Sequence, residues 1–157
     1  SLGALVTGAA GFAPCTAEAC MTLLRAHGID PAGKRVTVVG RSLVIGRPAA
    51  LLLTRADATV TLCHRKTPDL AARCRAADIL LAAAGAPGLI TPECVRPGQI
   101  VLDAGATALP DGTLRGDVTP AAAAIAACTP VPGGIGSVTT ALLLRHTVQA
   151  AEKSHHF

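Results

Sequence analysis

Aromatic side chains are nearly missing from this sequence of 157 residues, which has no tryptophan, no tyrosine and two phenylalanines. Proteins that bind single-stranded nucleic acids stack bases on aromatic rings, so the net charge of +4 does not indicate a nucleic-acid partner. Long apolar runs are missing too. Half of the residues are hydrophobic, but no run reaches the roughly 18 residues that a membrane-spanning helix needs. We therefore expect neither a nucleic-acid nor a membrane partner.

The sequence also lacks paired metal-binding or disulfide motifs. Its six cysteines form no C-x-x-C pair, and several lie in apolar segments. The first residues have neither the basic start nor the long apolar core of a secretory signal. Reduced thiols and a cytoplasmic location are expected. No metal is expected, and four histidines are interpreted as surface or helix-end residues, namely His27, His146, His155 and His156.

The order of apolar segments predicts the fold class. Short apolar runs, several of them β-branched, predict strands at 35–39, 59–63, 78–83, 100–104 and 128–131, and longer patterns predict helices at 18–27, 48–55, 69–76 and 138–152. Thr16 is the expected N-cap of the first helix, and Pro48 the expected first residue of the second. Strands that alternate with helices predict a single α/β domain with a Rossmann-like, doubly wound parallel sheet.

Two glycine-rich loops are the most informative segments. In the first, residues 38–48 read Val-Val-Gly-Arg-Ser-Leu-Val-Ile-Gly-Arg-Pro, so a strand runs into a G-x-S-x-x-x-G turn and then a helix. The second, residues 129–140, reads Thr-Pro-Val-Pro-Gly-Gly-Ile-Gly-Ser-Val-Thr-Thr and also opens a helix. Glycines let the main chain approach a ligand closely, and amides at a helix N-terminus suit anionic groups.

These loops occur with three further motifs, Pro-Cys-Thr at 14–16, Cys-His at 63–64 and Gly-Asp-Val at 116–118. In this order and spacing, from about residue 2 to about residue 151, the sequence resembles the methylenetetrahydrofolate dehydrogenase/cyclohydrolase family. The resemblance implies the NADP-binding C-terminal domain of an enzyme of one-carbon metabolism. The complete enzyme would transfer hydride from 5,10-methylenetetrahydrofolate to NADP and hydrolyse the methenyl product to 10-formyltetrahydrofolate.

The resemblance also implies what the chain does not contain. In the family, an N-terminal substrate domain contributes a Tyr-x-x-x-Lys pair, whereas this chain has no tyrosine and no lysine in a matching context. We therefore expect no catalytic residue here, and a tetrahydrofolate derivative shared with a missing N-terminal substrate domain. A homodimer is expected as well. The predicted organisation is a leading segment at 1–13 from the interdomain connection, the NAD(P)-binding domain at 14–152 and a tail at 153–157.

Cofactor-binding residues are expected in the loops that follow the first four strands. For the turn after the first strand, the alternative to a cofactor site is a plain strand-to-helix connection. The second strand ends in a basic turn without the carboxylate that would bind the ribose of NAD, which favours NADP; the alternative is a solvated basic turn. The predicted cofactor-binding residues are Gly40, Arg41, Ser42, Val44, Gly46, His64, Arg65, Thr67, Gly85, Pro87, Asp103 and Gly105.

Two aspartates have alternative interpretations. Asp117 in the Gly-Asp-Val motif is either a general base or a residue that orders a loop by accepting backbone hydrogen bonds, and Asp103 has the same ambiguity.

Substrate-binding residues are expected in the second glycine-rich loop, at Pro132, Gly133, Gly134 and Thr139. The family continues this loop with Pro-Met where this chain has Ser137-Val138, and it has asparagine where this chain has Thr107. The loop departures bear on folate affinity more than on cofactor binding.

Two other functions remain open from the sequence. One is a stand-alone, non-catalytic dinucleotide-binding or regulatory module. The other is the nucleotide domain of an amino-acid or shikimate dehydrogenase, which would not be expected to share the Thr-Pro-Val-Pro-Gly-Gly stretch.

Overall fold

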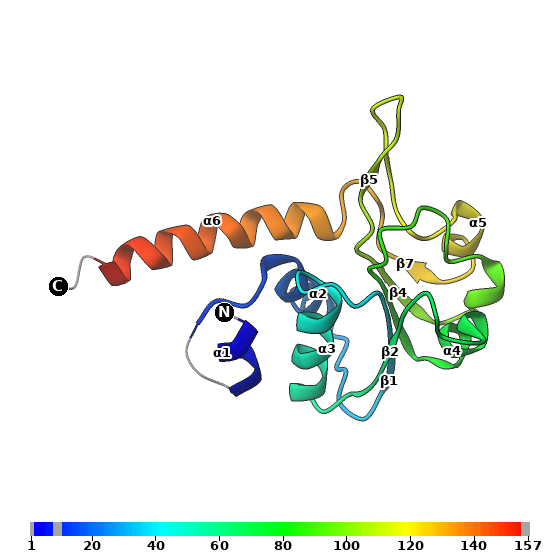
Figure 1. Ribbon diagram of the computed structural model, residues 1–157, viewed down its shortest axis with the longest axis horizontal. Helices are drawn as coiled ribbons and strands as arrows, with labels where there is room; N and C mark the ends of the chain where they lie inside the picture. Colours follow the sequence, from blue (N-terminus) through cyan, green and yellow to red (C-terminus); the bar gives the residue numbers. More distant parts are fainter. Residues whose placement is uncertain (1, 8–10, 155–157) are drawn as a thin grey trace.

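A five-stranded parallel sheet, in the order β2-β1-β3-β4-β7, forms the centre of the protein (Figure 1). The computed structural model describes residues 2–7 and 11–154. This architecture confirms the predicted Rossmann-like α/β fold. Its elements are α1 (Leu2–Thr7), α2 (Cys15–Ala26), β1 (Arg35–Val39), α3 (Gly46–Arg55), β2 (Thr59–Cys63), α4 (Leu70–Ala76), β3 (Ile79–Ala82), η1 (Pro92–Cys94), β4 (Ile100–Asp103), β5 (Thr107–Ala108), β6 (Leu114–Arg115), α5 (Pro120–Ala123), β7 (Ala127–Cys128) and α6 (Ile135–Ser154).

Helices cover both faces of the sheet. Successive side chains of a strand point to opposite faces, and in β1 both sets are buried, which explains its continuous apolar run. Val36 and Val38 pack with α2, α3 and α6, in a core that includes Leu24 and Leu53. On the other face Val39 packs in a second core with α4, η1 and α5. Figure 1 shows these two helical layers on either side of the strands.

The starts of three helices differ from the predictions by two or more residues, and α4 starts one residue later than predicted. Helix α2 begins at Cys15 after Pro14, so Thr16 lies inside the helix and is not its N-cap. Helix α3 begins at Gly46, which makes Pro48 its third residue. The missing N–H of Pro48 falls among the first four amides, which have no partner within the helix. Helix α6 starts at Ile135, three residues before the predicted start.

Other differences concern short elements and one histidine. The predicted strand at 128–131 is shortened to Ala127–Cys128, since prolines cannot donate ladder hydrogen bonds. Helix α1 and the projecting β5–β6 hairpin were not predicted. The interpretation of His146 as a surface or helix-end residue is wrong, because its side chain is buried, whereas His27 at the C-terminal end of α2 is exposed. His155 and His156 lie outside the described residues.

Strand order places a candidate binding crevice at one edge of the sheet. Strand β1 pairs with β2 on one side and with β3 on the other. Connections therefore leave β1 and β3 in opposite directions, and in such sheets ligands bind at the carboxyl ends of the strands beside this reversal. The loops after β1 and β3 are the ones that flank it.

Candidate functional site

The loops after β1 and β3 are in direct backbone contact. Gly40 follows β1 with φ +113°, and a Cβ on this residue would collide with the carbonyl oxygen of Ala83. A Cβ on Gly46 would in turn collide with the carbonyl oxygen of Gly40. The spacing of the first glycine-rich loop is therefore required by close approach of the main chain, which lets α3 start at the bottom of the crevice.

Ser42 organises the start of α3. Its Oγ accepts hydrogen bonds from the N–H groups of Ile45 at 3.0 Å and Gly46 at 3.4 Å. The hydroxyl of Ser42 still has its own proton to donate to an acceptor on a ligand. Two apolar neighbours, Leu43 and Val44, are 60% and 65% exposed, which is unusual for side chains of this size. The loop thus presents one hydroxyl and an apolar surface to the outside.

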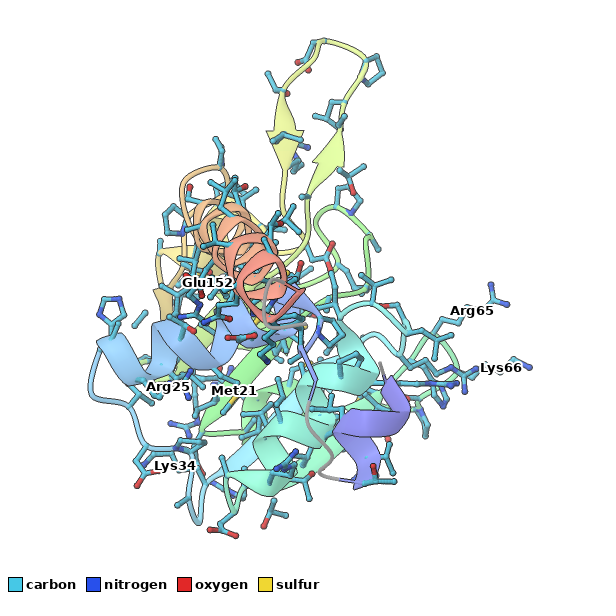
Figure 2. The ribbon with its side chains drawn as sticks, turned by 90° about the vertical axis from the view of Figure 1, so that its left-hand side faces the viewer. Met21, Arg25, Lys34, Arg65, Lys66 and Glu152 are labelled. Atoms are coloured by element: carbon cyan, nitrogen blue, oxygen red, sulfur yellow. The ribbon has the colours of Figure 1, made fainter. Side chains whose placement is uncertain are left out.

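The turn after β2 is held by His64 and Thr67. The backbone N–H of His64 donates to Thr67 Oγ1 at 2.9 Å, and the N–H of Lys66 donates to His64 Nδ1 at 3.2 Å. The side chains of Arg65 and Lys66 extend away from the protein into solvent (Figure 2). Neither forms an ion pair within the described part of the chain. The turn therefore offers two adjacent cations beside the crevice.

Asp117 ties down the loop after β3. One carboxylate oxygen accepts hydrogen bonds from the N–H groups of Ala84 at 2.6 Å and Gly85 at 3.1 Å, and the other accepts from Ala86 at 2.8 Å. The side chain is fully buried. All three donors are backbone amides, so the geometry favours the loop-ordering interpretation over a general base.

Asp103, the last residue of β4, makes a similar set of bonds. Its oxygens accept from the N–H groups of Gly105 at 2.9 Å, Asp117 at 3.0 Å and Val118 at 3.0 Å. Burial raises the pKa of this carboxyl, and the three amide hydrogen bonds oppose the rise. The backbone N–H of Asp103 donates to Thr129 Oγ1 at 2.9 Å. Thr129, Asp103 and Asp117 therefore connect the loops after β3, β4 and β7.

The predicted substrate-binding residues follow β7. The Val131–Pro132 peptide is cis, Gly133 has φ +94°, and Gly134 is buried against the carbonyl of Pro130. Thr139 lies within α6 and donates to the carbonyl of Ile135 at 2.9 Å. The hydrogen bond from Asp103 to Thr129 sets this loop beside the crevice.

Two cavities are lined by other segments than the loops after β1 and β3. One of about 440 Å³ is lined by α2, β4 and the start of the second glycine-rich loop, including Gly133 and Gly134. Another of about 580 Å³ lies between α1, α2, α3 and α6. Neither of these two cavities is lined by residues 40–46 or 84–88.

Two structural features are missing from the described residues. Within 2–7 and 11–154, no group of histidine, cysteine, aspartate and glutamate side chains could hold a metal ion. Over the same part of the chain, no helix combines the length and the apolar character that crossing a membrane requires.

Comparison with known proteins identifies close relatives. Residues 14–155 match the family described as "Tetrahydrofolate dehydrogenase/cyclohydrolase, NAD(P)-binding domain". "Bifunctional protein FolD 1" of Rhodococcus jostii (strain RHA1) is 58% identical over 153 residues, which are 96% of this chain and 52% of the relative. "Bifunctional protein FolD" of Moorella thermoacetica is 50% identical over 98% of this chain and 55% of its own length. The chain thus spans about half the length of these relatives.

Solved structures agree with the sequence comparison. The bifunctional enzyme FolD, methylenetetrahydrofolate dehydrogenase/cyclohydrolase, from Campylobacter jejuni superposes with a TM-score of 0.92 at 42% identity, over 98% of this chain and 55% of that one. The Trypanosoma brucei enzyme, complexed with NADP cofactor and inhibitor, gives 0.89 at 43% identity, over 99% of this chain and 57% of that one.

Proposed function

Because the chain belongs to the tetrahydrofolate dehydrogenase/cyclohydrolase family and matches its NAD(P)-binding domain, we propose that the crevice at the carboxyl ends of β1 and β3 binds NADP. The observation that carries the proposal is the contact between Gly40 and Ala83 beside a turn whose two cations form no ion pair with the described residues. Because Gly40 has no side chain, a dinucleotide backbone would be able to approach the start of α3 closely. The two cations suit a 2′-phosphate.

The residues present fit the cofactor. Gly40, Arg41, Ser42, Val44 and Gly46 would hold the pyrophosphate and adenosine, since the turn combines close backbone approach, a hydroxyl donor and an exposed apolar side chain. When bound, NADP supplies the hydride acceptor. The residues of this site would bind the cofactor and orient it.

The remaining predicted residues divide between the two ends of the cofactor. His64 and Thr67 fix the turn from which Arg65 reaches the 2′-phosphate. Gly85 and Pro87 would face the nicotinamide, because both are exposed in the loop that Asp117 holds. Asp103 and Gly105 act on this end indirectly, through the hydrogen bonds that join the loops.

We propose further that the complete protein oxidises 5,10-methylenetetrahydrofolate and hydrolyses the methenyl product to 10-formyltetrahydrofolate. In this chain Pro132, Gly133, Gly134 and Thr139 would contact the folate side, whereas the acid and base groups would come from outside these 157 residues. The absence of tyrosine supports that division. Ser137 and Val138 give the second loop an extra amide donor and a stiffer side chain than the Pro-Met pair of the family.

Titration calorimetry with NADP and NAD tests the cofactor proposal. We expect NADP to bind more tightly, and Arg65→Ala to reduce that preference by about tenfold, the lower end of what a charge-assisted hydrogen bond contributes, because the side chain is exposed. Arg25→Ala is the matched control, since Arg25 lies on α2, far from Arg65 (Figure 2). Equal affinity of the unmodified chain for NADP and NAD would overturn the proposal.

A spectrophotometric assay with methylenetetrahydrofolate and NADP tests whether the catalytic groups lie outside this chain. We expect the 157-residue chain to bind cofactor and show no turnover, because positioned acid and base groups contribute about 10² to 10⁴ in rate. Turnover by the pure chain would place the catalytic groups within it.

A further inference from the structure

A thiol, an imidazole and a carboxylate form a line where α2 and α6 pack together. Cys15 is the first residue of α2, and its Sγ lies 3.5 Å from Nδ1 of His146 on α6. The other ring nitrogen of His146, Nε2, lies 2.9 Å from Oε2 of Glu18, one turn further along α2. None of these three residues belongs to the cofactor site proposed above.

The imidazole is fixed in orientation. The ring of Phe12 stacks on it, with centroids 4.6 Å apart and planes inclined by 27°. Arg145 pairs with the other oxygen of Glu18, so both carboxylate oxygens have partners. His146 itself is buried, with 8% of its surface exposed. The ring cannot turn away from Cys15 without losing both its stacking and its ion-pair contact.

In cysteine enzymes, a thiol, an imidazole and a carboxylate in this order make an activated nucleophile. A carboxylate at Nε2 holds the ring proton there, which leaves Nδ1 free to accept the proton of Cys15. The resulting imidazolium would be stabilised by Glu18, and the thiolate by the positive end of α2, because Cys15 starts that helix.

The remaining cysteines have a different environment. Burial raises the pKa of Cys20 and Cys74 to about 12, and it also raises the pKa of Cys63. Cys94 is buried. Cys128 is half-buried like Cys15, but desolvation and the nearby carboxylate of Asp103 raise its pKa to about 11. In the described part of the chain, Cys15 alone among the cysteines has a histidine partner.

We propose that Cys15 is a modification site, a nucleophilic thiol activated by His146 and Glu18 that reacts with small hydroperoxides. The thiolate sulfur attacks one peroxide oxygen and the O–O bond breaks. Cys15 is oxidised to a sulfenic acid, the peroxide is reduced, and the leaving oxygen takes the proton from His146 to depart as water or an alcohol. The product lies between α2 and α6, where an added oxygen alters their packing.

Competitive alkylation tests the activation directly. The protein is treated with limiting iodoacetamide at pH 7, and the labelled cysteine peptides are quantified by mass spectrometry. An ordinary thiol is only a few per cent thiolate at this pH, so full activation raises the rate by about tenfold or more. We expect Cys15 to react at least tenfold faster than the cysteine of an unstructured peptide in the same mixture, which is the ordinary-thiol reference, while Cys128, half-buried like Cys15, reports changes in exposure.

Two variants separate activation from exposure. We expect His146→Gln to slow the labelling of Cys15 about tenfold and Glu18→Gln to slow it severalfold, with Cys128 unchanged in both. Circular dichroism checks that each variant is folded. If His146→Gln does not fold, Glu18→Gln, which retains the imidazole, still tests the proposal. Labelling of Cys15 that is no faster than that of the peptide cysteine, or that neither variant slows, overturns the proposal.

Hydrogen peroxide with dimedone, which traps sulfenic acids, tests the co-reactant. We expect a dimedone adduct on Cys15 that His146→Gln diminishes. Fast alkylation without this adduct would overturn the assignment to hydroperoxides.

Discussion

Replacing Asp117 by asparagine tests how the crevice is held together. The two side chains have the same shape, but asparagine places an amino group where Asp117 has an acceptor oxygen. At least one N–H of residues 84–86 would then face a donor, while the other two would lose a charged acceptor. We expect the loop after β3 to loosen and the binding of nicotinamide to weaken.

The size of the effect follows from the hydrogen bonds. A bond to a charged group contributes about 1.5–3 kcal/mol, and a buried unsatisfied donor costs about 1–3 kcal/mol. One bond lost and two weakened therefore remove on the order of 4 kcal/mol. Burial and, after it, the charge of Asp117 raise the pKa of Asp103, so removing that charge offsets a part of this loss. A loss of up to about 4 kcal/mol lowers Tm by up to about 8–16 °C in a domain of this size.

Thermal unfolding and calorimetry with two ligands measure both consequences. In the proposed site NADP would contact both ends of the crevice, whereas 2′,5′-ADP lacks the nicotinamide. We expect Asp117→Asn to reduce affinity for NADP about tenfold and to leave 2′,5′-ADP unchanged. Asp111→Asn, in the exposed hairpin, is the control. A wild-type Tm, or an equal loss for both ligands, would refute the reasoning.

Three further predictions concern stability and assembly. Asp78 pairs with Arg35 and Arg96, which hold its pKa at about 2. Because the pKa is lowered, the ion pairs of Asp78 stabilise the fold fully above the ordinary pKa of 3.8, and this contribution is lost as the pH falls towards 2. Asp78→Asn should therefore lower the free energy of unfolding by about 1 kcal/mol at pH 7, after allowance for solvent exposure. Urea unfolding should show a smaller loss at pH 3. Gly40→Ala should cost about 2–4 kcal/mol through strain and collision, against about 1 kcal/mol for the control Gly28→Ala, which has positive φ but no atom near the added Cβ. The exposed apolar residues of α6 should support a homodimer, and a monomer at every concentration in light scattering would contradict it.

Much of the fold could be predicted because its signals are local. The apolar run at 35–39 and the turn that begins at Gly40 each fit within one short window, so the strand and its loop were placed correctly. The β5–β6 hairpin was not predicted because its strands have two residues each, too few for an alternation of apolar and polar residues to be visible. Prolines shortened the strand before the second glycine-rich loop.

The site is harder to read because its key partners are distant in sequence. Asp103 and Asp117 looked alike as candidate bases or loop-ordering residues, and only packing shows that each accepts three amides. Cys15 and His146 are separated by 131 positions and meet through the packing of α2 on α6. No local pattern encodes such a meeting, so His146 was misplaced on the surface.

The hydrogen-bonded chain from Thr129 through Asp103 to Asp117 has a consequence for protein engineering. It couples the loops after β3, β4 and β7 into one structural unit, although they are separated in the sequence. A chimaera that takes one of these loops from another dehydrogenase has to keep its amides in place for a buried carboxylate, whereas a transplant of all three carries the partners along. Recombination libraries built on this domain should therefore place their crossovers outside the span from residue 84 to residue 129.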